Sequence, residues 1–226
     1  MQNYKDILKK IMFCLKLRDT LPARIVNKVH IKDNNERLID LKTDGTFFFG
    51  DELQKREAVY LRETVYKKLC KARNYLPENY CFKIYSAFRS QQEQQMLWDE
   101  KYKQMKSKYP DLPEEQLIFR VKSVCADPRF GFGGHQTGGA VDISLCNPDG
   151  IDYPMGTKWA EVNKKTKTKS KFLSDEEHKN RFILVNVMKK VGFVNYPPEW
   201  WHYCYGDRMW AAYTCKNSCI YGKAEL

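Results

Sequence analysis

The sequence predicts an α+β domain in which a central antiparallel sheet is flanked by helices. Segments with helical spacing of apolar residues lie between short, separated segments that are typical of strands, and this order favours the α+β class. A chain of 226 residues is long for one small domain and short for two, so we expect a single domain with added elements. A hydrophobic content of 42% is enough to form a buried core.

The first 50 residues are predicted to form an N-terminal extension packed on the main domain, which comprises residues 51–226. Apolar residues at helical spacing predict a helix from Tyr4 to Leu17, and Pro22 ends this pattern. Short strands are expected near Leu38–Leu41 and Thr46–Phe49, where turn-forming residues separate apolar runs.

The next part of the chain predicts two helices around one strand, followed by a third helix. Apolar residues recur at helical spacing between about 55 and 75, and residues 81–87 are typical of a strand. Ser90 and Glu93 form a capping-box pattern that opens a helix extending to about Lys106. The third helix is expected to begin at Pro113 and to end near Cys125.

The C-terminal half contains two further predicted strands and one helix. Residues 140–145 predict a strand with its apolar side chains on one face and Asp142 on the other. A long loop is expected over residues 147–173, then a final helix that Ser174 caps and Gly192 ends. An aromatic strand over residues 200–205 is expected to complete the sheet.

Two short motifs carry the residues of a zinc site. Six residues separate His135 from Asp142 on its strand, and Glu199 precedes His202 by three residues. Two imidazoles and one carboxylate form the ligand set of a catalytic site that keeps one position open for water, so we expect one Zn²⁺ per chain. Glu199 is then the candidate proton acceptor. Because residues 199 and 202 would point to opposite faces of a straight strand, a bend near Pro197 is also expected.

These motifs resemble the D-alanyl-D-alanine dipeptidase and carboxypeptidase family of zinc peptidases, which share the zinc core of hedgehog-type domains. The resemblance extends from about Leu61 to Tyr205 and is greatest to the dipeptidases, including those of vancomycin resistance. It implies a hedgehog-like D,D-peptidase fold and a role for each matching residue. The implied zinc ligands are His135, Asp142 and His202, the implied general base is Glu199, and the implied oxyanion-stabilising residue is Arg89.

The chain differs from the family pattern at positions where a serine is common. Gly133 lies two residues before the first histidine of the motif, and Gly139 follows the same histidine by four residues. The arginine turn is Ala-Phe-Arg-Ser instead of the more usual Gly-Tyr-Arg-Pro. We expect zinc binding to tolerate both glycines, whereas a hydroxyl that could bind substrate is lost.

Three functions are compatible with these residues. The resemblance implies foremost a zinc dipeptidase that hydrolyses D-alanyl-D-alanine, with a small D-amino-acid dipeptide or a peptidoglycan-derived peptide as its partner. A peptidoglycan D,D-carboxypeptidase or endopeptidase is the second possibility, and a non-catalytic zinc-binding protein is the third. A purely structural site would need neither Glu199 nor Arg89, which argues against the third. The exact substrate, the physiological role and the oligomeric state stay open.

Composition adds expectations about partners and compartment. No apolar run is long enough to span a membrane and no signal-peptide core is present, so we expect a cytoplasmic protein with its eight cysteines reduced. A second metal cluster of Cys204, Cys215 and Cys219 is disfavoured, because the spacing matches no zinc motif. The net charge of +11 suits a polyanion, but no nucleic-acid motif accompanies it, and the lysine-rich residues 164–171 are expected to form a solvated, mobile loop.

Overall fold

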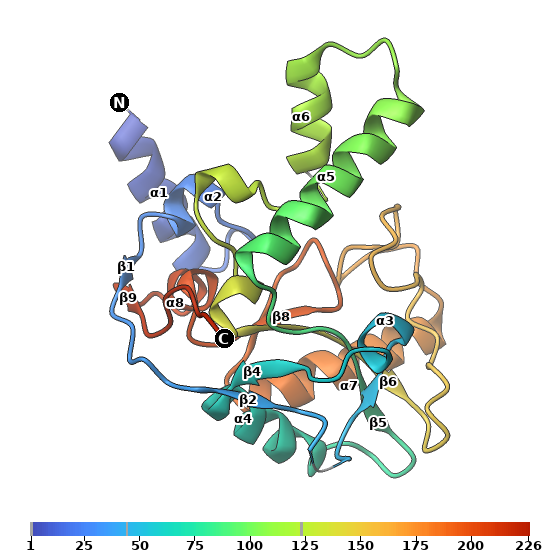
Figure 1. The fold of residues 1–226 in the computed structure, drawn as a ribbon. Coiled ribbons are helices and arrows are strands. Elements are labelled where there is room, and N and C mark those ends of the chain that lie inside the picture. The colour runs from blue at the N-terminus through green and yellow to red at the C-terminus, as the bar shows by residue number, and fades with distance from the viewer. Residues whose placement is uncertain (1, 44, 123) are drawn as a thin grey trace.

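A mixed five-stranded sheet forms the centre of the computed structural model, which describes residues 2–43, 45–122 and 124–226 (Figure 1). The strand order is β3-β5-β6-β8-β7. The bounds are β3 Phe48–Phe49, β5 Cys81–Ser86, β6 Ala140–Cys146, β8 His202–Cys204 and β7 Val194–Asn195. The predicted α+β class is confirmed. The predicted antiparallel pairing is correct for all neighbours except the edge pair β3 and β5, which is parallel.

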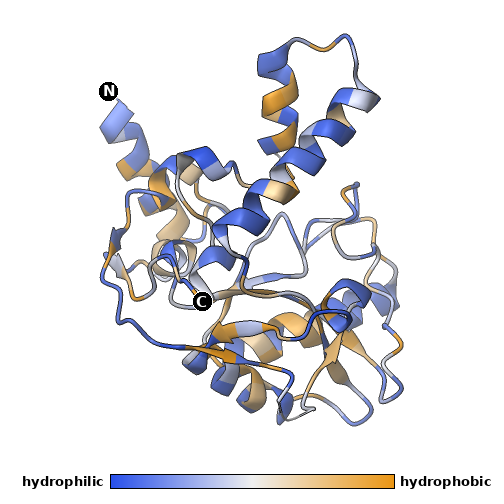
Figure 2. Cartoon of the chain, viewed as in Figure 1, coloured by the Kyte–Doolittle hydropathy of each residue, from blue (hydrophilic) through white to orange (hydrophobic). Residues whose placement is uncertain are grey.

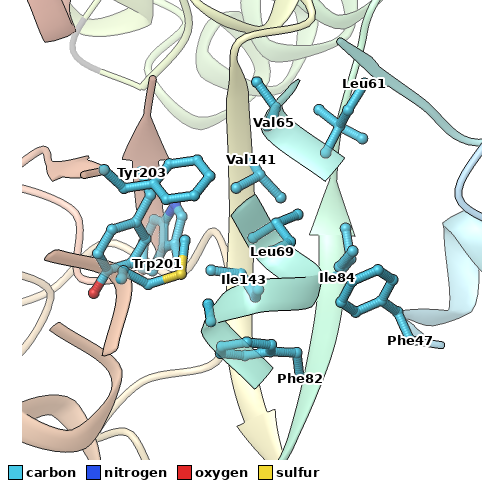
Figure 3. Packing of buried hydrophobic residues seen from close by; sticks show 14 of the residues in the cluster. Phe47, Leu61, Val65, Leu69, Phe82, Ile84, Val141, Ile143, Trp201 and Tyr203 are labelled. Atoms are coloured by element: carbon cyan, nitrogen blue, oxygen red, sulfur yellow. The ribbon is translucent and has the colours of Figure 1, made fainter. Parts of the chain in front are cut away.

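Two helices, α4 (Glu63–Arg73) and α7 (Asp175–Lys190), bury their apolar faces against one side of this sheet. Figure 3 shows the centre of the contact, where α4 side chains meet β5 and β6. The members of this core labelled there on α4, β5 and β6 are Val65, Leu69, Phe82, Ile84, Val141 and Ile143. Because side chains alternate along β6, Asp142 lies on the opposite face from Val141 and Ile143, as predicted.

A helical hairpin of α5 (Gln91–Lys108) and α6 (Glu114–Lys122) projects from the body of the molecule (Figure 1). It has a small core of its own, formed by Trp98, Val121 and Cys125. Both predicted capping boxes are present. Ser90 accepts from the Glu93 amide at the start of α5, and Ser174 does the same for Glu177 at the start of α7.

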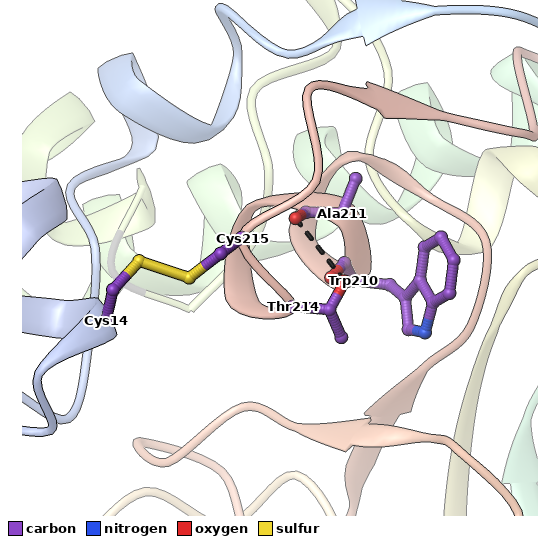
Figure 4. Close-up of a disulfide and its surroundings, with 5 residues drawn as sticks. All are labelled: Cys14, Trp210, Ala211, Thr214 and Cys215. Carbon is purple, nitrogen blue, oxygen red and sulfur yellow. Dashed lines mark hydrogen bonds between the residues drawn. A yellow bond between two sulfur atoms is a disulfide. The ribbon is translucent and has the colours of Figure 1, made fainter.

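The two ends of the chain lie together. Strand β1 (His30–Ile31) pairs in parallel with β9 (Ser218–Cys219), and α2 (Ala23–Val26) contacts α8 (Arg208–Tyr213). A disulfide joins Cys14, at the end of α1 (Gln2–Cys14), to Cys215 just after α8 (Figure 4). The prediction that all cysteines are reduced is therefore wrong for this pair. The two cysteines are 201 residues apart in the sequence, so their proximity arises only when both ends of the chain fold together.

The structure differs from the predicted elements at several points. The helix expected from residue 55 is preceded by a strand, β4 (Tyr60–Arg62), which pairs with β2 (Leu38–Asp40), so Leu61 is a strand residue. Leu61 is buried in this strand, so its apolar character is explained by the strand as well as by the predicted helix. The helix ending before Gly192 is not the last one, because α8 follows it. A short helix, α3, covers Asp51–Gln54, and 3-10 turns cover Pro128–Phe130 and His135–Thr137.

Segments from both sides of residue 50 pair in these sheets, and the predicted domain boundary there stays a prediction. Among the described residues, no helix combines the length and the apolar character that crossing a membrane requires.

Candidate metal centre

Three residues predicted as ligands converge on one point. Asp142 on β6 and His202 on β8 are direct register partners in the sheet, and the 3-10 turn that begins at His135 places a second imidazole beside them. Their donor atoms all lie within 4.8 Å of one another, and among the described residues this is the one group with such spacing. Asp142 Oδ1 is 2.9 Å from His202 Nδ1 and 3.4 Å from His135 Nε2. The arrangement can hold a metal ion between three inward-facing atoms.

Each of these side chains has its other polar atom held by a neighbour. His135 Nδ1 donates to the Ala87 carbonyl at 2.8 Å, which directs Nε2 inward. Asp142 Oδ2 accepts from the Trp159 indole at 3.0 Å, and His202 Nε2 lies 3.2 Å from Cys204 Sγ. Outer partners of this kind fix the ring orientation and tautomer of a metal ligand. The residues present therefore fit a tetrahedral metal such as zinc, with one position left for water.

Burial and mutual charge shift the titration of the three groups in different directions. Burial lowers the pKa of His135 below its usual value, and nearby Asp142 only partly opposes this. Burial disfavours the charged forms of Asp142 and His202 as well, but His135 and then His202 outweigh it at Asp142, and Asp142 outweighs it at His202. The pKa of Asp142 is thus lowered and that of His202 is raised. The carboxylate is ionised at neutral pH, as a metal ligand must be.

Glu199 lies in the turn that precedes β8, and this removes the geometric difficulty of a straight strand. The His202 amide donates to the Glu199 carbonyl at 3.3 Å, and the Glu199 amide donates to the Tyr196 carbonyl at 2.9 Å. The expected bend near Pro197 is therefore confirmed. Burial raises the pKa of the Glu199 carboxyl, His202 opposes this and Asp142 adds to it. A carboxylate with a raised pKa beside the three donors is suited to accepting and releasing a proton.

Arg89 lies between β5 and α5, and its guanidinium is held from two directions. Nη1 donates to Gln94 Oε1 and Nη2 donates to Ser86 Oγ, both at 3.0 Å. The Arg89 amide donates to the His135 carbonyl at 3.2 Å, which links the arginine turn directly to the first histidine. The Arg89 charge is also among the causes that lower the pKa of His135, after burial. A cation is thus fixed at the edge of the donor cluster.

The comparison with known families bears on this geometry. The family model described as D-ala-D-ala dipeptidase, Peptidase_M15, matches residues 38–220, most of the chain. The chain belongs to this family. It is therefore a metallopeptidase, and the converging donors are consistent with the metal cofactor of that class.

Similar proteins match different shares of the chain. The D-alanyl-D-alanine dipeptidase of Synechocystis is 25% identical over 205 residues, covering 79% of this chain and 82% of that protein. The D-alanyl-D-alanine dipeptidase of Escherichia coli is 28% identical over 120 residues, covering 53% of this chain and 52% of that protein. Among solved structures, VanYB in complex with D-alanine-D-alanine is 16% identical, with a TM-score of 0.49 over 84% of this chain and 93% of that one.

Sequence reasoning missed two side chains that hold the donor cluster of this Peptidase_M15 protein. Trp159 comes from the long loop, where no periodicity indicates which residue turns inward. The sequence suggests Cys204 only as a member of the disfavoured second metal cluster, yet this cysteine is buried against His202, and Cys215 forms the disulfide. His202 and Cys204 are two positions apart on one strand, so the alternation of strand side chains could have placed both on the same face.

The long loop over residues 147–173 is present as predicted, and its lysine-rich part is anchored. Thr166, Thr168 and Ser170 are buried between the solvated lysines. Arg181 on α7 donates to the carbonyls of Met155, Lys165 and Lys167, and burial lowers its pKa to about 10. The expectation of solvated lysines is confirmed except at Lys165, which is half-buried and forms an ion pair with Glu177 at 2.9 Å. The dense hydrogen bonding does not support a mobile backbone. The anchored loop delivers Trp159 to Asp142.

The two glycines that replace common serines have different surroundings. A Cβ on Gly139 would lie 2.5 Å from the Tyr205 carbonyl oxygen and 2.9 Å from Thr137 Oγ1, so a side chain does not fit. At Gly133 the nearest atom, the Ala126 Cβ, would be 3.7 Å away, an ordinary contact. Gly139 is thus required by close packing, whereas Gly133 is not.

Proposed function

We propose that this protein is a zinc-dependent dipeptidase that hydrolyses D-alanyl-D-alanine, with one Zn²⁺ held by His135, Asp142 and His202. The observation that carries the proposal is the convergence of their three inward-facing donor atoms, each ligand being braced by an outer hydrogen-bond partner. Membership of the Peptidase_M15 family and the relatives named D-alanyl-D-alanine dipeptidases support the reaction and the substrate class.

In this proposal a bound zinc ion supplies Lewis-acid activation of water and of the scissile carbonyl. Glu199 takes a proton from the attacking water and delivers it to the nitrogen of the leaving amino acid, so the C–N bond breaks as a neutral amine departs. The raised pKa of this carboxyl favours the first transfer, because a more basic carboxylate accepts the water proton more readily.

Arg89 has the electrostatic role. Its guanidinium is fixed by Gln94 and Ser86 before any substrate arrives, so stabilising the developing oxyanion requires little rearrangement. Gln94 is itself buried and donates to the Ala126 carbonyl at 2.8 Å, which fixes the bracing side chain in turn. Fixed donors of this kind typically contribute about 3–4 kcal/mol each to transition-state stabilisation.

The test combines metal analysis with a substrate panel. Purified protein should contain one zinc ion per chain, and His135→Ala should lose it. Glu199→Gln should retain zinc and lose nearly all turnover, since the amide cannot accept the water proton but keeps the size of the side chain. Full activity of Glu199→Gln would remove this residue from the mechanism, and undiminished zinc in His135→Ala would remove the ligand assignment.

The panel should contain D-Ala-D-Ala, L-Ala-L-Ala and intact muropeptides, each with and without a chelator. Release of free D-alanine from D-Ala-D-Ala, abolished by the chelator, is the expected result. Chelator-sensitive cleavage of muropeptides with D-Ala-D-Ala untouched would replace the dipeptidase proposal with a carboxypeptidase or endopeptidase. Zinc binding without cleavage of any substrate would favour the non-catalytic alternative.

A further inference from the structure

The N-terminal helix α1 turns most of its large apolar side chains away from the protein. Tyr4, Leu8, Ile11 and Leu15 recur at helical spacing, so they form one stripe, which Ile7 widens. The Leu15 amide donates to the Ile11 carbonyl at 2.9 Å, which continues the helical bonding past Cys14. These five side chains are between 46% and 73% exposed, so the part of the chain that the structure describes leaves the stripe uncovered.

The opposite side of α1 is fixed to the body, so the outward stripe does not result from a detached helix. Asp6 is buried and forms ion pairs with Arg24 at 3.0 Å and Lys28 at 3.3 Å. Phe13 packs on Tyr213, with ring centroids 4.7 Å apart. The disulfide at Cys14 secures the C-terminal end of the helix (Figure 4). An ordinary surface helix buries its apolar stripe and exposes its charged residues. Helix α1 instead buries its single carboxylate, Asp6, and exposes its apolar stripe.

The charge around the stripe is uniformly positive. Lys5 and Lys9 lie on one side of it and Lys10 on the other, by their helical positions. The one acidic residue of the helix, Asp6, faces the body and is neutralised by its two partners. The whole chain adds a net charge of +11. Figures 1 and 2 show α1 at the periphery of the molecule, with apolar segments on an otherwise hydrophilic helix.

We propose that α1 docks this protein on an anionic lipid surface, lying parallel to it with the apolar stripe in the boundary between headgroups and acyl chains. An apolar stripe flanked by lysines is the pattern of helices that bind in this plane, because the lysines reach the anionic headgroups while the stripe leaves water. A hollow of about 360 Å³ lies beside the stripe and extends its apolar contact; it is lined by Ile7, Lys10, Ile11, Cys14, Leu15 and Cys215.

A second copy of the chain fits this face less well than lipid does. Two stripes packed together would bring the lysines of both helices close to one another, and no exposed carboxylate of α1 would compensate them. A lipid surface with anionic headgroups supplies both the apolar layer and the opposite charge. This inference does not depend on the reaction proposed for the metal centre.

The test is co-sedimentation of the full-length protein with vesicles. Vesicles of phosphatidylcholine mixed with phosphatidylglycerol should bind the protein, and vesicles of phosphatidylcholine alone should bind it much more weakly. High salt should weaken the binding, since the lysine contribution is screened. The double variant Ile7→Ser/Ile11→Ser should lower the partition coefficient at least about tenfold, because two large side chains no longer leave water.

The matched control is Phe119→Ser on α6, which removes an even more exposed apolar side chain far from α1 in the sequence. It should bind vesicles like the unmodified protein. Unchanged circular dichroism and unchanged peptidase turnover would show that the double variant is folded. Equal vesicle binding by the double variant and the unmodified protein would overturn the proposal. So would concentration-dependent dimerisation in sedimentation velocity that Ile7→Ser/Ile11→Ser abolishes while no vesicle binding is seen.

Discussion

Replacing Trp159 by phenylalanine tests whether the long loop supports the proposed zinc site. The Trp159 indole donates to Asp142 Oδ2 at 3.0 Å, and its ring stacks on Tyr85 with centroids 5.5 Å apart and planes inclined by 22°. Phenylalanine can keep the stacking and removes only the N–H donor. The inner oxygen of Asp142 and both histidines are left in place.

The expected loss follows from the kind of bond removed. A hydrogen bond to a charged acceptor contributes about 1.5–3 kcal/mol, and loss of an outer partner of a metal ligand typically costs about 10- to 100-fold in metal affinity. The two ranges agree, because a tenfold change corresponds to about 1.4 kcal/mol. Trp159 is only half-buried, so water can replace part of the lost donor. We therefore expect the zinc dissociation constant of Trp159→Phe to rise about tenfold, the lower end of the range.

Competition with a chromophoric zinc chelator measures this constant on the intact protein. The control is Trp200→Phe, which removes an indole bond to Thr157 Oγ1 at 2.8 Å from a fully buried side chain. Among the described residues, the ring contacts of Trp200 are with Trp201 and Arg181 and not with a proposed ligand. That variant should lose thermal stability and keep its zinc affinity. A Trp159→Phe affinity within about twofold of the unmodified protein, or an equal loss in both variants, would refute the positioning role.

Three further outcomes are expected. Arg89→Ala should lower kcat by about 10²–10³ with little change in KM, because the charge acts chiefly in the transition state. Steady-state kinetics on D-Ala-D-Ala would contradict this role if KM rose and kcat did not fall. Cys204→Ala should weaken zinc binding about tenfold by releasing His202 Nε2, and Cys204→Ser should restore it; equal affinities in all three proteins would exclude this role. Gly139→Ser should lower stability by about 1–3 kcal/mol, since its Cβ would lie 2.5 Å from a backbone oxygen, whereas Gly133→Ser should be neutral in thermal denaturation.

The sequence predicted those parts of the fold whose signals are local. The two capping boxes depend on residues three positions apart, and both helices begin where Ser90 and Ser174 indicated. The face of β6 that carries Asp142 follows from alternation alone. The motif spacing likewise indicated which donors would converge, because register pairing of β6 with β8 sets Asp142 opposite His202.

What the sequence did not predict depends on contacts between distant segments. Leu61 fits helical spacing with the residues after it, but pairing with β2 makes it a strand residue. Cys14 and Cys215 meet only because α1 and α8 both pack at the joined ends of the chain. Trp159 lies in a loop with no periodicity, and its direction is set by residues far along the chain. Such contacts are tertiary, and no local pattern encodes them.

The support of Asp142 can be followed into the body of the protein. Trp159 donates a hydrogen bond to the carboxylate, and Arg181 holds the loop that carries Trp159. The Arg181 guanidinium donates to the backbone carbonyls of Met155, Lys165, Lys167 and Thr168. Burying a guanidinium costs free energy unless its N–H donors are hydrogen-bonded. An irregular loop supplies many acceptors, because its backbone carbonyls are not paired within a helix or sheet. The loop thus satisfies the arginine while the arginine fixes the loop. Residues 155–168 are thereby anchored to α7, whose apolar face packs on β6, the same strand that carries Asp142. The orientation of one proposed ligand therefore depends on the hydrophobic core through both its own strand and the loop above it.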